Sequence, residues 1–396
     1  MSTATHSRFE PFHASVLQKA GMVGSFTTKD AVTRLFALAG VGIDGPNPWD
    51  IQVHDERFFR RVLGGGSLGL GEAYMDGDWH ADSIDQLFDR VISAKLSDKL
   101  GMTVPIAVLM LAAHLRNRQS LSRAEDVARA HYDLPTDIHE ATYDKRLTAS
   151  CAYWRNATNL DQAQEDKLEL ICRKIGLRSH HSVLDIGCGW GAFIGYAAEE
   201  HGTRCTGITV SSEQVAYIKN RYKLLPLQPL HLDYRLYDGP PVDRVVSVGM
   251  FEHVGAKNHR TFFECARRYL KPGGVFLLHT IWENERHPVI DAWQDKYIFP
   301  NGDLPSLGEI ASAVEGLFVV EDVHNFGTDY DSTLMAWNSN FQSRRADVAT
   351  RHGERFCRMW EYYLLQNAAA FRCRHINVGQ LVLTPNGLRG GYQSVR

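Results

Sequence analysis

The stretch VLDIGCGWGAF, residues 183–193, decides the fold of this chain. An apolar run that contains one acid leads into Gly187, Gly189 and Gly191, and a helix-forming sequence follows. Glycine lets the backbone turn sharply and lets a ligand approach without a Cβ in the way. A strand, a glycine-rich turn and a helix in this order are typical of cofactor sites in α/β proteins, although several classes of cofactor use them.

Strand and helix patterns alternate from this turn onward, which implies βαβ units and a parallel sheet. Helices are predicted from Ala192, Ser212 and Asn258. Two late apolar runs flank a long helical stretch, residues 334–374, and are predicted to complete a mostly parallel, seven-stranded, Rossmann-like α/β sheet. The predicted strands are residues 182–187, 205–210, 229–234, 243–251, 274–281, 317–326 and 380–384.

The composition divides the chain into four parts. Residues 1–25 are predicted to be a flexible leader, and residues 26–115 a small, mainly helical domain. Residues 116–130 are polar and mostly cationic, as in a linker, and the domain with the glycine turn spans residues 131–396.

Charge, cysteine usage and hydropathy exclude several classes of function. The formal net charge of −3 over 396 residues argues against non-specific binding of nucleic acid by the whole chain. Seven cysteines without a CxxC pair or a metal-ligand spacing predict reduced thiols in a cytoplasm and no metal site. The N-terminus lacks the apolar core of a signal peptide, and the longest apolar run, residues 102–115, is too short to cross a bilayer.

Acidic residues near the glycine turn select among the cofactors. A nicotinamide site requires an acid about 20 residues beyond the turn, at the end of the next strand. That strand ends in GITV, residues 207–210, without an acid, whereas Asp185 precedes the first glycine and Asp233 follows the third strand. These carboxylates suit the amine of S-adenosylmethionine (SAM) and the amino group of its adenine. The pattern favours SAM over NAD, with a Rossmann-like turn of some other use as a further alternative.

Longer stretches resemble the bacterial cyclopropane-fatty-acyl-phospholipid synthases from about residue 35 to the end of the chain. The most specific are FEHVG at 251–255, HTI at 279–281 and DYDSTLMAW at 329–337. Mycolic-acid cyclopropane synthases share the catalytic half but lack the N-terminal domain. The stretch GSLGLGEAYMDGDW, residues 66–79, therefore points to the phospholipid branch.

The resemblance implies a SAM-dependent methyltransferase fold and a defined reaction. The SAM methyl group moves onto a cis double bond of a phospholipid acyl chain, and loss of one proton, with bound bicarbonate as the base, closes a cyclopropane ring. The implied bicarbonate site consists of the Cys151 and Ile281 backbones, Glu252, His279 and Tyr330. The implied SAM site consists of Ser150, Gly187, Gly189, Thr209, Gln214 and Asp233, to which the glycine turn adds Asp185 and Gly191.

This chemistry requires a dry site that stabilises a cation and offers it no nucleophile. Aromatic faces stabilise cations in this way, although core packing is the alternative role for each candidate. The candidates are Tyr143, Tyr153, Phe251, Trp282, Tyr297, Phe299, Tyr330 and Trp337.

A bicarbonate base needs hydrogen-bond donors and one acceptor for its own OH. Glu252 can accept that OH and is expected to hydrogen-bond His279. His279, Tyr330 and free backbone N–H groups near Cys151 and Ile281 can donate. Glu252 and His279 are predicted at the ends of the fourth and fifth strands, the edge at which open α/β sheets bind ligands, and we expect their pKa values to be perturbed.

Three positions qualify the resemblance. Cys151 is not expected to be a nucleophile, because methyl transfer needs no covalent enzyme intermediate and no adjacent histidine is available to form a thiolate. Ala149 stands where the family often has a tyrosine that contacts SAM. Gly379 stands where a large aromatic residue is frequent, so the local packing is expected to differ.

The implied substrate lies in a membrane, so peripheral docking on the inner face is expected of this cytoplasmic protein. Two basic and apolar segments, residues 57–63 and 105–118, are candidates for docking, with core packing as the alternative. The resemblance also implies a homodimer, and the aromatic stretch at 355–371 could form either core or interface.

Other functions stay open at this point. A related SAM methyltransferase would make methyl-branched or methylene lipids from the same unsaturated chains. A small-molecule N- or O-methyltransferase would not need the three specific stretches. A lipid-binding protein with an inactive SAM fold would not need Glu252, His279 and Tyr330.

Overall fold

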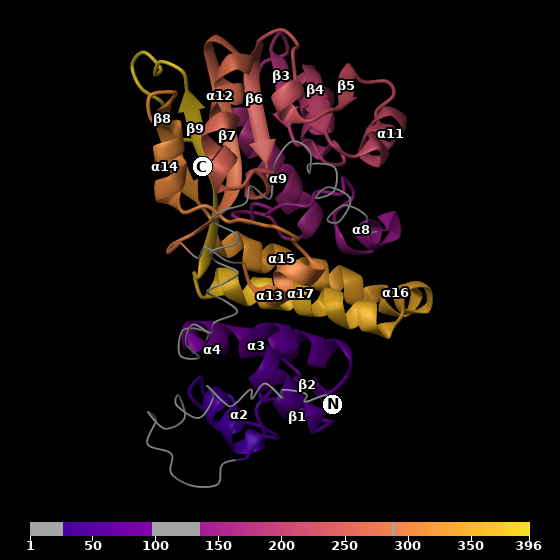
Figure 1. Cartoon of the computed structure of the whole chain (residues 1–396). Coiled ribbons are helices and arrows are strands. Elements are labelled where there is room, and N and C mark those ends of the chain that lie inside the picture. Colours follow the sequence, from indigo (N-terminus) through magenta and orange to yellow (C-terminus); the bar gives the residue numbers. More distant parts are fainter. Residues whose placement is uncertain (1–26, 97–134, 287–289) are drawn as a thin grey trace, which may run out of the picture.

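The computed structural model describes residues 27–96, 135–286 and 290–396 of the chain. An α/β domain lies at one end and a small helical domain at the other, with a layer of long helices between them (Figure 1). The predicted leader, the linker at 116–130 and the candidate docking segment at 105–118 lie outside the described residues.

The α/β domain is built on a seven-stranded sheet in the order β5-β4-β3-β6-β7-β9-β8. Every neighbouring pair is parallel except β7–β9 and β8–β9, so the prediction of a mostly parallel sheet of seven strands is confirmed. The strands are β3 (Ser182–Ile186), β4 (Arg204–Thr209), β5 (Leu227–His231), β6 (Val242–Val248), β7 (Leu270–Glu283), β8 (Val319–Asn325) and β9 (Ile376–Thr384).

Helices cover both faces of this sheet because its central strands are apolar on both sides. One face packs against α9 (Leu160–Lys174), α10 (Ala192–His201) and α11 (Ser212–Arg221). The other face packs against α12 (His259–Tyr269) and α14 (Leu307–Val314). The glycine turn lies between β3 and α10, where the carboxyl ends of the parallel strands meet.

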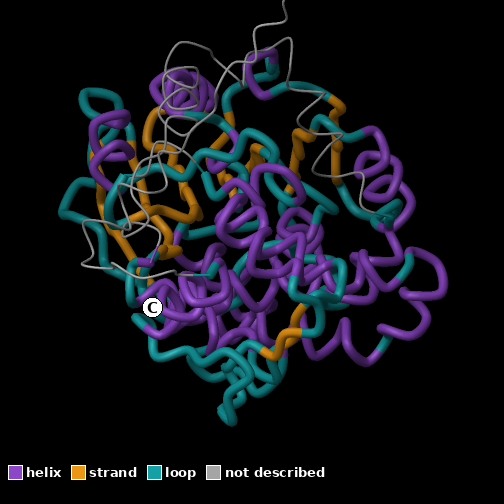
Figure 2. The backbone as a smooth tube through the Cα atoms, turned by 60° about the horizontal axis from the view of Figure 1, so that its bottom comes forward, coloured by secondary structure: helices purple, strands orange, loops and turns teal. Residues whose placement is uncertain are grey.

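The predicted long helix is three helices. They are α15 (Thr328–Ser343), α16 (Arg345–His352) and α17 (Glu354–Arg372). The second break falls at Gly353, whose φ of 83° no helix accommodates. The aromatic face of α17 is buried against α15 on one side and the small domain on the other, so this stretch is core. Seen from below, these helices lie in front of the strands (Figure 2).

The small domain contains α2 (Thr28–Ala37), α3 (Arg57–Met75) and α4 (Ile84–Ser93), with β1 (Gln52–Val53) paired to β2 (Trp79–His80). The glycines near the middle of α3 include Gly66, whose φ of 55° and ψ of −131° put a kink into the helix. The short helices α8 (Thr136–Thr142) and α13 (Ala292–Tyr297) belong to the layer beside the α/β domain.

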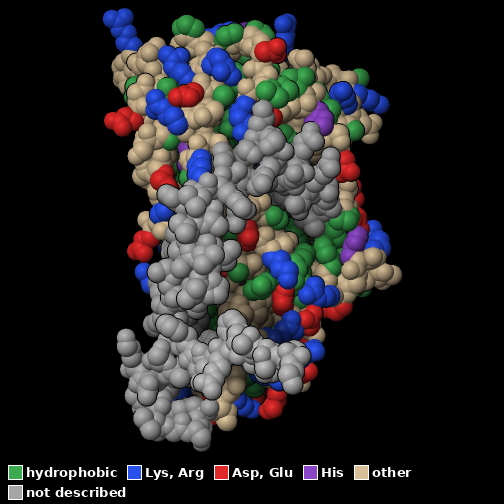
Figure 3. Space-filling model, in the orientation of Figure 1, with side chains coloured by type: hydrophobic (Ala, Val, Ile, Leu, Met, Phe, Trp, Pro, Cys, Tyr) green, Lys and Arg blue, Asp and Glu red, His purple; other side chains and the backbone are tan. Residues whose placement is uncertain are grey.

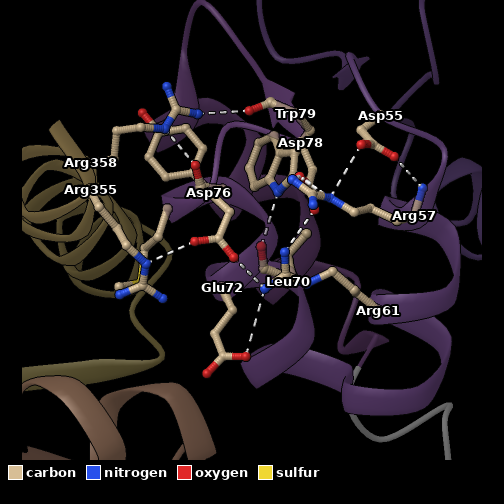
Figure 4. A network of polar contacts seen from close by, with 12 residues as sticks. Asp55, Arg57, Arg61, Leu70, Glu72, Asp76, Asp78, Trp79, Arg355 and Arg358 are labelled. Atoms are coloured by element: carbon tan, nitrogen blue, oxygen red, sulfur yellow. Dashed lines mark hydrogen bonds and ion pairs between the residues drawn. The ribbon is translucent and has the colours of Figure 1, made fainter.

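The candidate docking segment at the start of α3 is part of the core of the small domain. Phe58 and Phe59 are 0% and 3% exposed. Arg57 and Arg61 both hydrogen-bond the buried Asp78, at 2.7 and 2.8 Å (Figure 4). The core-packing alternative is therefore confirmed for this segment, because its rings point inward and two of its three arginines are paired.

Polar contacts and one close approach join α3 to the α/β half of the chain. Asp76 accepts from Arg355 at 2.8 Å, as Figure 4 shows. Glu72 accepts from Lys296 at 2.6 Å and from Tyr297 at 2.8 Å, so it anchors α13 to α3. Gly71 lies flat against the ring of Trp293, which a Cβ at this position would overlap.

No membrane-spanning helix is found among the described residues. None of the described helices is both long and apolar enough to cross a bilayer. On the face shown in Figure 3, acidic and basic side chains are interspersed, in keeping with the formal net charge of −3.

The contact between Gly71 and Trp293 predicts a destabilising substitution with a matched control in the same helix. Gly71→Ala should lower the free energy of unfolding by about 1–3 kcal/mol, because the added methyl overpacks the interface. Gly64→Ala should raise the free energy of unfolding by up to about 1 kcal/mol, because Gly64 faces open space and alanine favours a helix. Thermal unfolding of both variants checks this, and equal shifts in the same direction would contradict it.

Candidate active site

The glycine turn is open where a cofactor would lie. Gly187, Gly189 and Gly191 all have positive φ, at 87°, 52° and 82°. A Cβ built at Gly189 would meet no atom of the described residues within 4 Å, so those residues leave the backbone there open. The predicted turn is therefore present, and it leaves room for a ligand against its backbone.

Asp185 and Gln214 present unpaired polar atoms beside this turn. Asp185 is buried, its Oδ1 has no hydrogen-bond partner among the described residues, and burial raises the pKa of its carboxyl to about 7. Thr209, at the end of β4, donates to Gln214 Oε1, and no described residue bonds Gln214 Nε2. An unpaired buried acid and an open amide suit a ligand that carries an ammonium group and hydrogen-bond acceptors, and SAM carries both.

The environment of Asp233 differs from the expectation that its carboxylate is available to the adenine of SAM. It follows β5, as predicted, but both of its oxygens are bound by Arg235, at 2.8 Å from Nε and 2.7 Å from Nη2. An adenine amino group would share a carboxylate that Arg235 already neutralises.

Ser150 and Cys151 lie between the glycine turn and α15. The Ser150 hydroxyl accepts a hydrogen bond from Lys167 at 2.8 Å, and its carbonyl accepts one from Gln164 at 2.9 Å. A Cβ at Gly249, just after β6, would lie 3.6 Å from the Cβ of Ser150. Ser150 is therefore held against α9 and lies beside the carboxyl end of β6, and the neighbouring Ala149 is exposed.

The Glu252 carboxylate is fixed by a hydrogen bond to one of its two oxygens. It lies in a single 3₁₀ turn after β6, and its Oε1 accepts a hydrogen bond from the Ile281 N–H at 2.7 Å. Its Oε2 is buried and has no partner in the described part of the chain, and burial raises the pKa of the carboxyl to about 7. The expectation that the Ile281 N–H is free for an anion is wrong, because Glu252 occupies it.

His279 lies in the middle of β7, opposite Val248 at the end of β6 and Gln380 on β9. The Gln380 amide contacts His279 Nδ1 at 3.4 Å, while Nε2 is buried without a partner. Burial and the nearby Lys167 hold its pKa well below the usual range, so the ring is neutral. The expected His279–Glu252 hydrogen bond is not among the contacts of the described residues, and the open atoms of both groups are available to a third partner.

Tyr330 comes to this site from the first turn of α15. Its side chain is buried, which raises the pKa of its hydroxyl, and Tyr363, Cys151, Glu252 and Tyr143 are near enough to raise it further. The structure thus gathers Cys151, Glu252 and Tyr330 from segments far apart in the sequence.

The candidate aromatic residues separate into two groups. Tyr143, Tyr330 and Trp337 form one cluster, with ring centroids 4.7 Å apart for Tyr143–Trp337 and 5.9 Å for Tyr330–Trp337. The others fill different roles: Phe251 packs in the sheet core, Trp282 over Gly379, Tyr297 against α3, Tyr153 against His324 and Phe299 against His253. Among these described candidates, only Tyr143, Tyr330 and Trp337 form one connected cluster of rings.

The Cys151 thiol is unsuited to nucleophilic attack. Its side chain is fully buried, and burial raises its pKa well above that of a free thiol. The sulfur donates to the Ala152 carbonyl at 3.2 Å. A neutral, hydrogen-bonded thiol agrees with the expectation that Cys151 contributes through its backbone.

Sequence reasoning missed four buried residues of the site: Gln164, Lys167, Tyr363 and Gln380. Gln164 and Lys167 are polar residues three apart on the buried face of a predicted helix, and that pattern could have marked them. No local pattern distinguishes Gln380 or Tyr363, because their partners come from other elements.

One group of residues resembles a metal site although no metal-ligand spacing exists in the sequence. Ligand atoms of Glu169, Cys172 and His201 lie within 4.8 Å of one another. The hydrogen bond of 2.9 Å between Glu169 and His201 already explains the contact between two of them.

Comparison with known proteins agrees with this geometry. Residues 119–381 match the family model described as mycolic acid cyclopropane synthetase. A cyclopropane-fatty-acyl-phospholipid synthase of Escherichia coli strain K12 is 46% identical over 90% of this chain and 94% of its own length. The cyclopropane mycolic acid synthase MmaA2 of Mycobacterium tuberculosis strain H37Rv is 33% identical over 65% of this chain and 96% of its own length.

Solved structures give the same picture. The cyclopropane synthase MmaA2 of Mycobacterium tuberculosis superposes with a TM-score of 0.62 at 29% identity, over 65% of this chain and 97% of that one. Mycolic acid cyclopropane synthase CmaA1, in complex with S-adenosylhomocysteine (SAH) and CTAB, gives 0.61 at 31% identity, over 65% and 97%.

Asp185 predicts a pH-dependent affinity for SAM. Its carboxyl has a pKa of about 7 and must lose its proton to pair with an ammonium group, so affinity should rise between pH 6 and pH 8. Asp185→Asn should bind SAM roughly tenfold more weakly at pH 8 and should lack this rise. Asp233→Asn, at a carboxylate that Arg235 neutralises, should keep it. Calorimetric titrations at the two pH values test the pair, and parallel pH profiles for Asp185→Asn and the wild type would refute the assignment.

Proposed function

The chain belongs to the mycolic acid cyclopropane synthetase family, and on that premise we propose that it is a cyclopropane-fatty-acyl-phospholipid synthase. It is a SAM-dependent methyltransferase that acts on a cis double bond of a phospholipid acyl chain and leaves a cyclopropane ring there. SAM bound at the glycine turn supplies the methyl group and leaves as SAH, the molecule present in the CmaA1 complex.

One observation carries this proposal beyond family membership. The buried Glu252 carboxylate lies near the buried Tyr330 phenol, and the buried His279 imidazole is neutral; Glu252 and His279 each keep one atom unpaired among the described residues, which supports a ligand between them. Unpaired buried polar atoms cost about 1–3 kcal/mol each, so a structure retains them where a ligand satisfies them.

The base proposed for this site is a bicarbonate ion, which takes a proton from the transferred methyl group. The protein supports it through complementary partners. Glu252 Oε2 is the acceptor for its OH, and His279 Nε2 and the Tyr330 hydroxyl are donors. A Gln380 amide that donates to His279 Nδ1, with which it is in contact at 3.4 Å, would leave the imidazole proton on Nε2 and make that atom a donor.

The walls of the site protect the cationic intermediate. Methyl addition to an alkene leaves a carbocation, which water or a thiolate would capture. The faces of Tyr143, Tyr330 and Trp337 stabilise positive charge by cation–π attraction. Burial keeps the Cys151 thiol protonated, so it does not compete with the base.

The small N-terminal domain favours phospholipid as the substrate. The Escherichia coli synthase aligns over 90% of this chain, a span that includes this domain, whereas the mycolic acid enzyme aligns over 65%. Glu72 and Gly71 attach this domain to α13. We place the enzyme at the inner face of the cytoplasmic membrane as a peripheral homodimer, with the residues that contact lipid outside α3.

The decisive experiment combines the purified protein with SAM, bicarbonate and vesicles of a cis-monounsaturated phospholipid. Mass spectrometry should show a gain of one CH₂ per acyl chain, and NMR should show the high-field protons of a cyclopropane ring. A gain of CH₂ without ring protons would establish the alternative, a methyl-branched or methylene product. No gain in mass, with SAM binding shown separately, would reject the proposal.

Glu252→Gln should lower the turnover number by about 100-fold or more, the usual effect of losing a group that positions a general base. Its affinity for SAM should stay within about twofold, because the side-chain hydrogen bond of Glu252 goes to the Ile281 N–H and the carboxylate is assigned to the base. Glu264→Gln, at an exposed carboxylate of α12, is the control for Glu252→Gln.

Depleting carbon dioxide should slow the wild type, and added bicarbonate should restore the rate. A wild-type rate indifferent to bicarbonate would exclude this base.

Cys151→Ser should retain activity within about threefold of the wild type, because the thiol is protonated and forms no covalent intermediate. Transfer of the labelled methyl group from SAM to vesicles measures the rate. Near-total loss of activity, with normal folding and SAM binding, would show that the sulfur takes part.

A further inference from the structure

Two lysines on α9 are buried almost completely and lie seven residues apart. Lys167 is 0% exposed and Lys174 is 1% exposed. Burying an ammonium group is costly, so each is expected to have a partner that offsets the cost. Lys174 has such a partner away from the glycine turn, because its Nζ contacts His324 Nδ1 at 2.9 Å.

Lys167 lies at the cofactor turn and is only partly satisfied. Its Nζ donates to Ser150 Oγ at 2.8 Å, the one hydrogen bond of its three N–H groups among the described residues. Burial lowers the pKa of Lys167 to about 8, and Asp144 and Asp185 are close enough to oppose this shift and stabilise its charge. Asp144 is already bound to the 146–148 segment, and Asp185 has one oxygen without a partner.

The hydrogen bond from Lys167 determines what the Ser150 hydroxyl can do. Because Ser150 Oγ accepts from an ammonium group, its own proton points elsewhere and is available to an acceptor. Gln164 fixes the backbone of the same residue through its carbonyl. The Ser150 hydroxyl is therefore a well-fixed hydrogen-bond donor, and the charge of Lys167 lies next to its oxygen.

The amino-acid end of SAM carries an ammonium and a carboxylate on one carbon atom. Asp185 suits the ammonium, so the carboxylate must lie within a few ångströms of it. A carboxylate in a buried site needs donors and positive potential, and the hydroxyl of Ser150 backed by Lys167 supplies both. The ammonium of SAM would then face the Asp185 carboxylate, and the carboxylate of SAM would face the Ser150 hydroxyl with the Lys167 charge behind it.

We propose that Lys167 is a positioning residue of the cofactor site, which recognises the carboxylate of SAM through the hydroxyl of Ser150. This inference rests on the proposed use of SAM and adds the residue that selects its amino-acid end. It concerns binding alone, so it extends to SAH, which has the same amino acid.

The test compares two ligands that differ by the carboxylate. Calorimetry measures the affinity of the wild type and of Lys167→Met for SAM and for decarboxylated SAM. Lys167→Met should weaken SAM binding by about tenfold to a hundredfold, because a buried charge loses its partner. The affinity for decarboxylated SAM should change less than about threefold, because that ligand has no carboxylate to lose.

Matched variants separate this role from a general effect on α9. Lys174→Met removes the other buried lysine of the same helix and should leave the preference for the carboxylate intact. Lys167→Arg keeps the charge and should restore part of that preference. If Lys167→Met does not fold, Lys167→Gln, which can still donate to Ser150 but carries no charge, provides the same comparison.

The outcomes distinguish this inference from the function on which it rests. A wild type that does not bind SAM rejects the proposed function and this inference with it. A wild type that binds SAM, with equal losses for both ligands in Lys167→Met, makes Lys167 merely structural. Unchanged affinity for both ligands also overturns the inference and leaves the proposed function in place.

Discussion

The hydrogen bond of 2.7 Å between Glu252 Oε1 and the Ile281 N–H is the contact on which the rest of the site depends. It ties the segment after β6 to β7 and leaves one carboxylate oxygen buried and open. The same division recurs in His279, bound at Nδ1 and open at Nε2, and in Gln214, bound at its oxygen and open at its nitrogen. Each group is oriented by the protein through one atom and keeps the other for a ligand, which is how a dry pocket stays both rigid and polar.

The fold could be predicted from local sequence because each element carries its own signal. Strand β3 and the glycine turn appear in eleven consecutive residues, and the alternation that follows fixes the class of sheet. The break at Gly353 was missed although glycine stands there, because the apolar pattern continues on both sides of it. The antiparallel pairing of β9 with both β7 and β8 depends on contacts between distant segments.

The residues of the candidate site could be predicted from the sequence, whereas their hydrogen-bond partners were harder to predict. Glu252 and Tyr330 belong to distinctive motifs, yet the partner of Glu252 is the Ile281 N–H, 29 residues away in a separate motif, and neither motif shows that the two groups pair. Arg57 and Arg61 suggested a docking surface until Asp78, about twenty residues on, was found to bind both. Whether a charge faces lipid or a buried acid is decided by tertiary structure, and local sequence leaves that choice open.

Gly379 and Trp282 occupy neighbouring strands, and a Cβ at Gly379 would overlap the Trp282 ring and the His324 carbonyl. The Trp282 ring therefore fills the volume that a side chain at residue 379 would occupy. A large residue at 379 with a small one at 282 would build the same wall from β9 instead of β7, after a small displacement of β8. The two positions thus form a reciprocal pair, in which a large side chain at one requires a small side chain at the other.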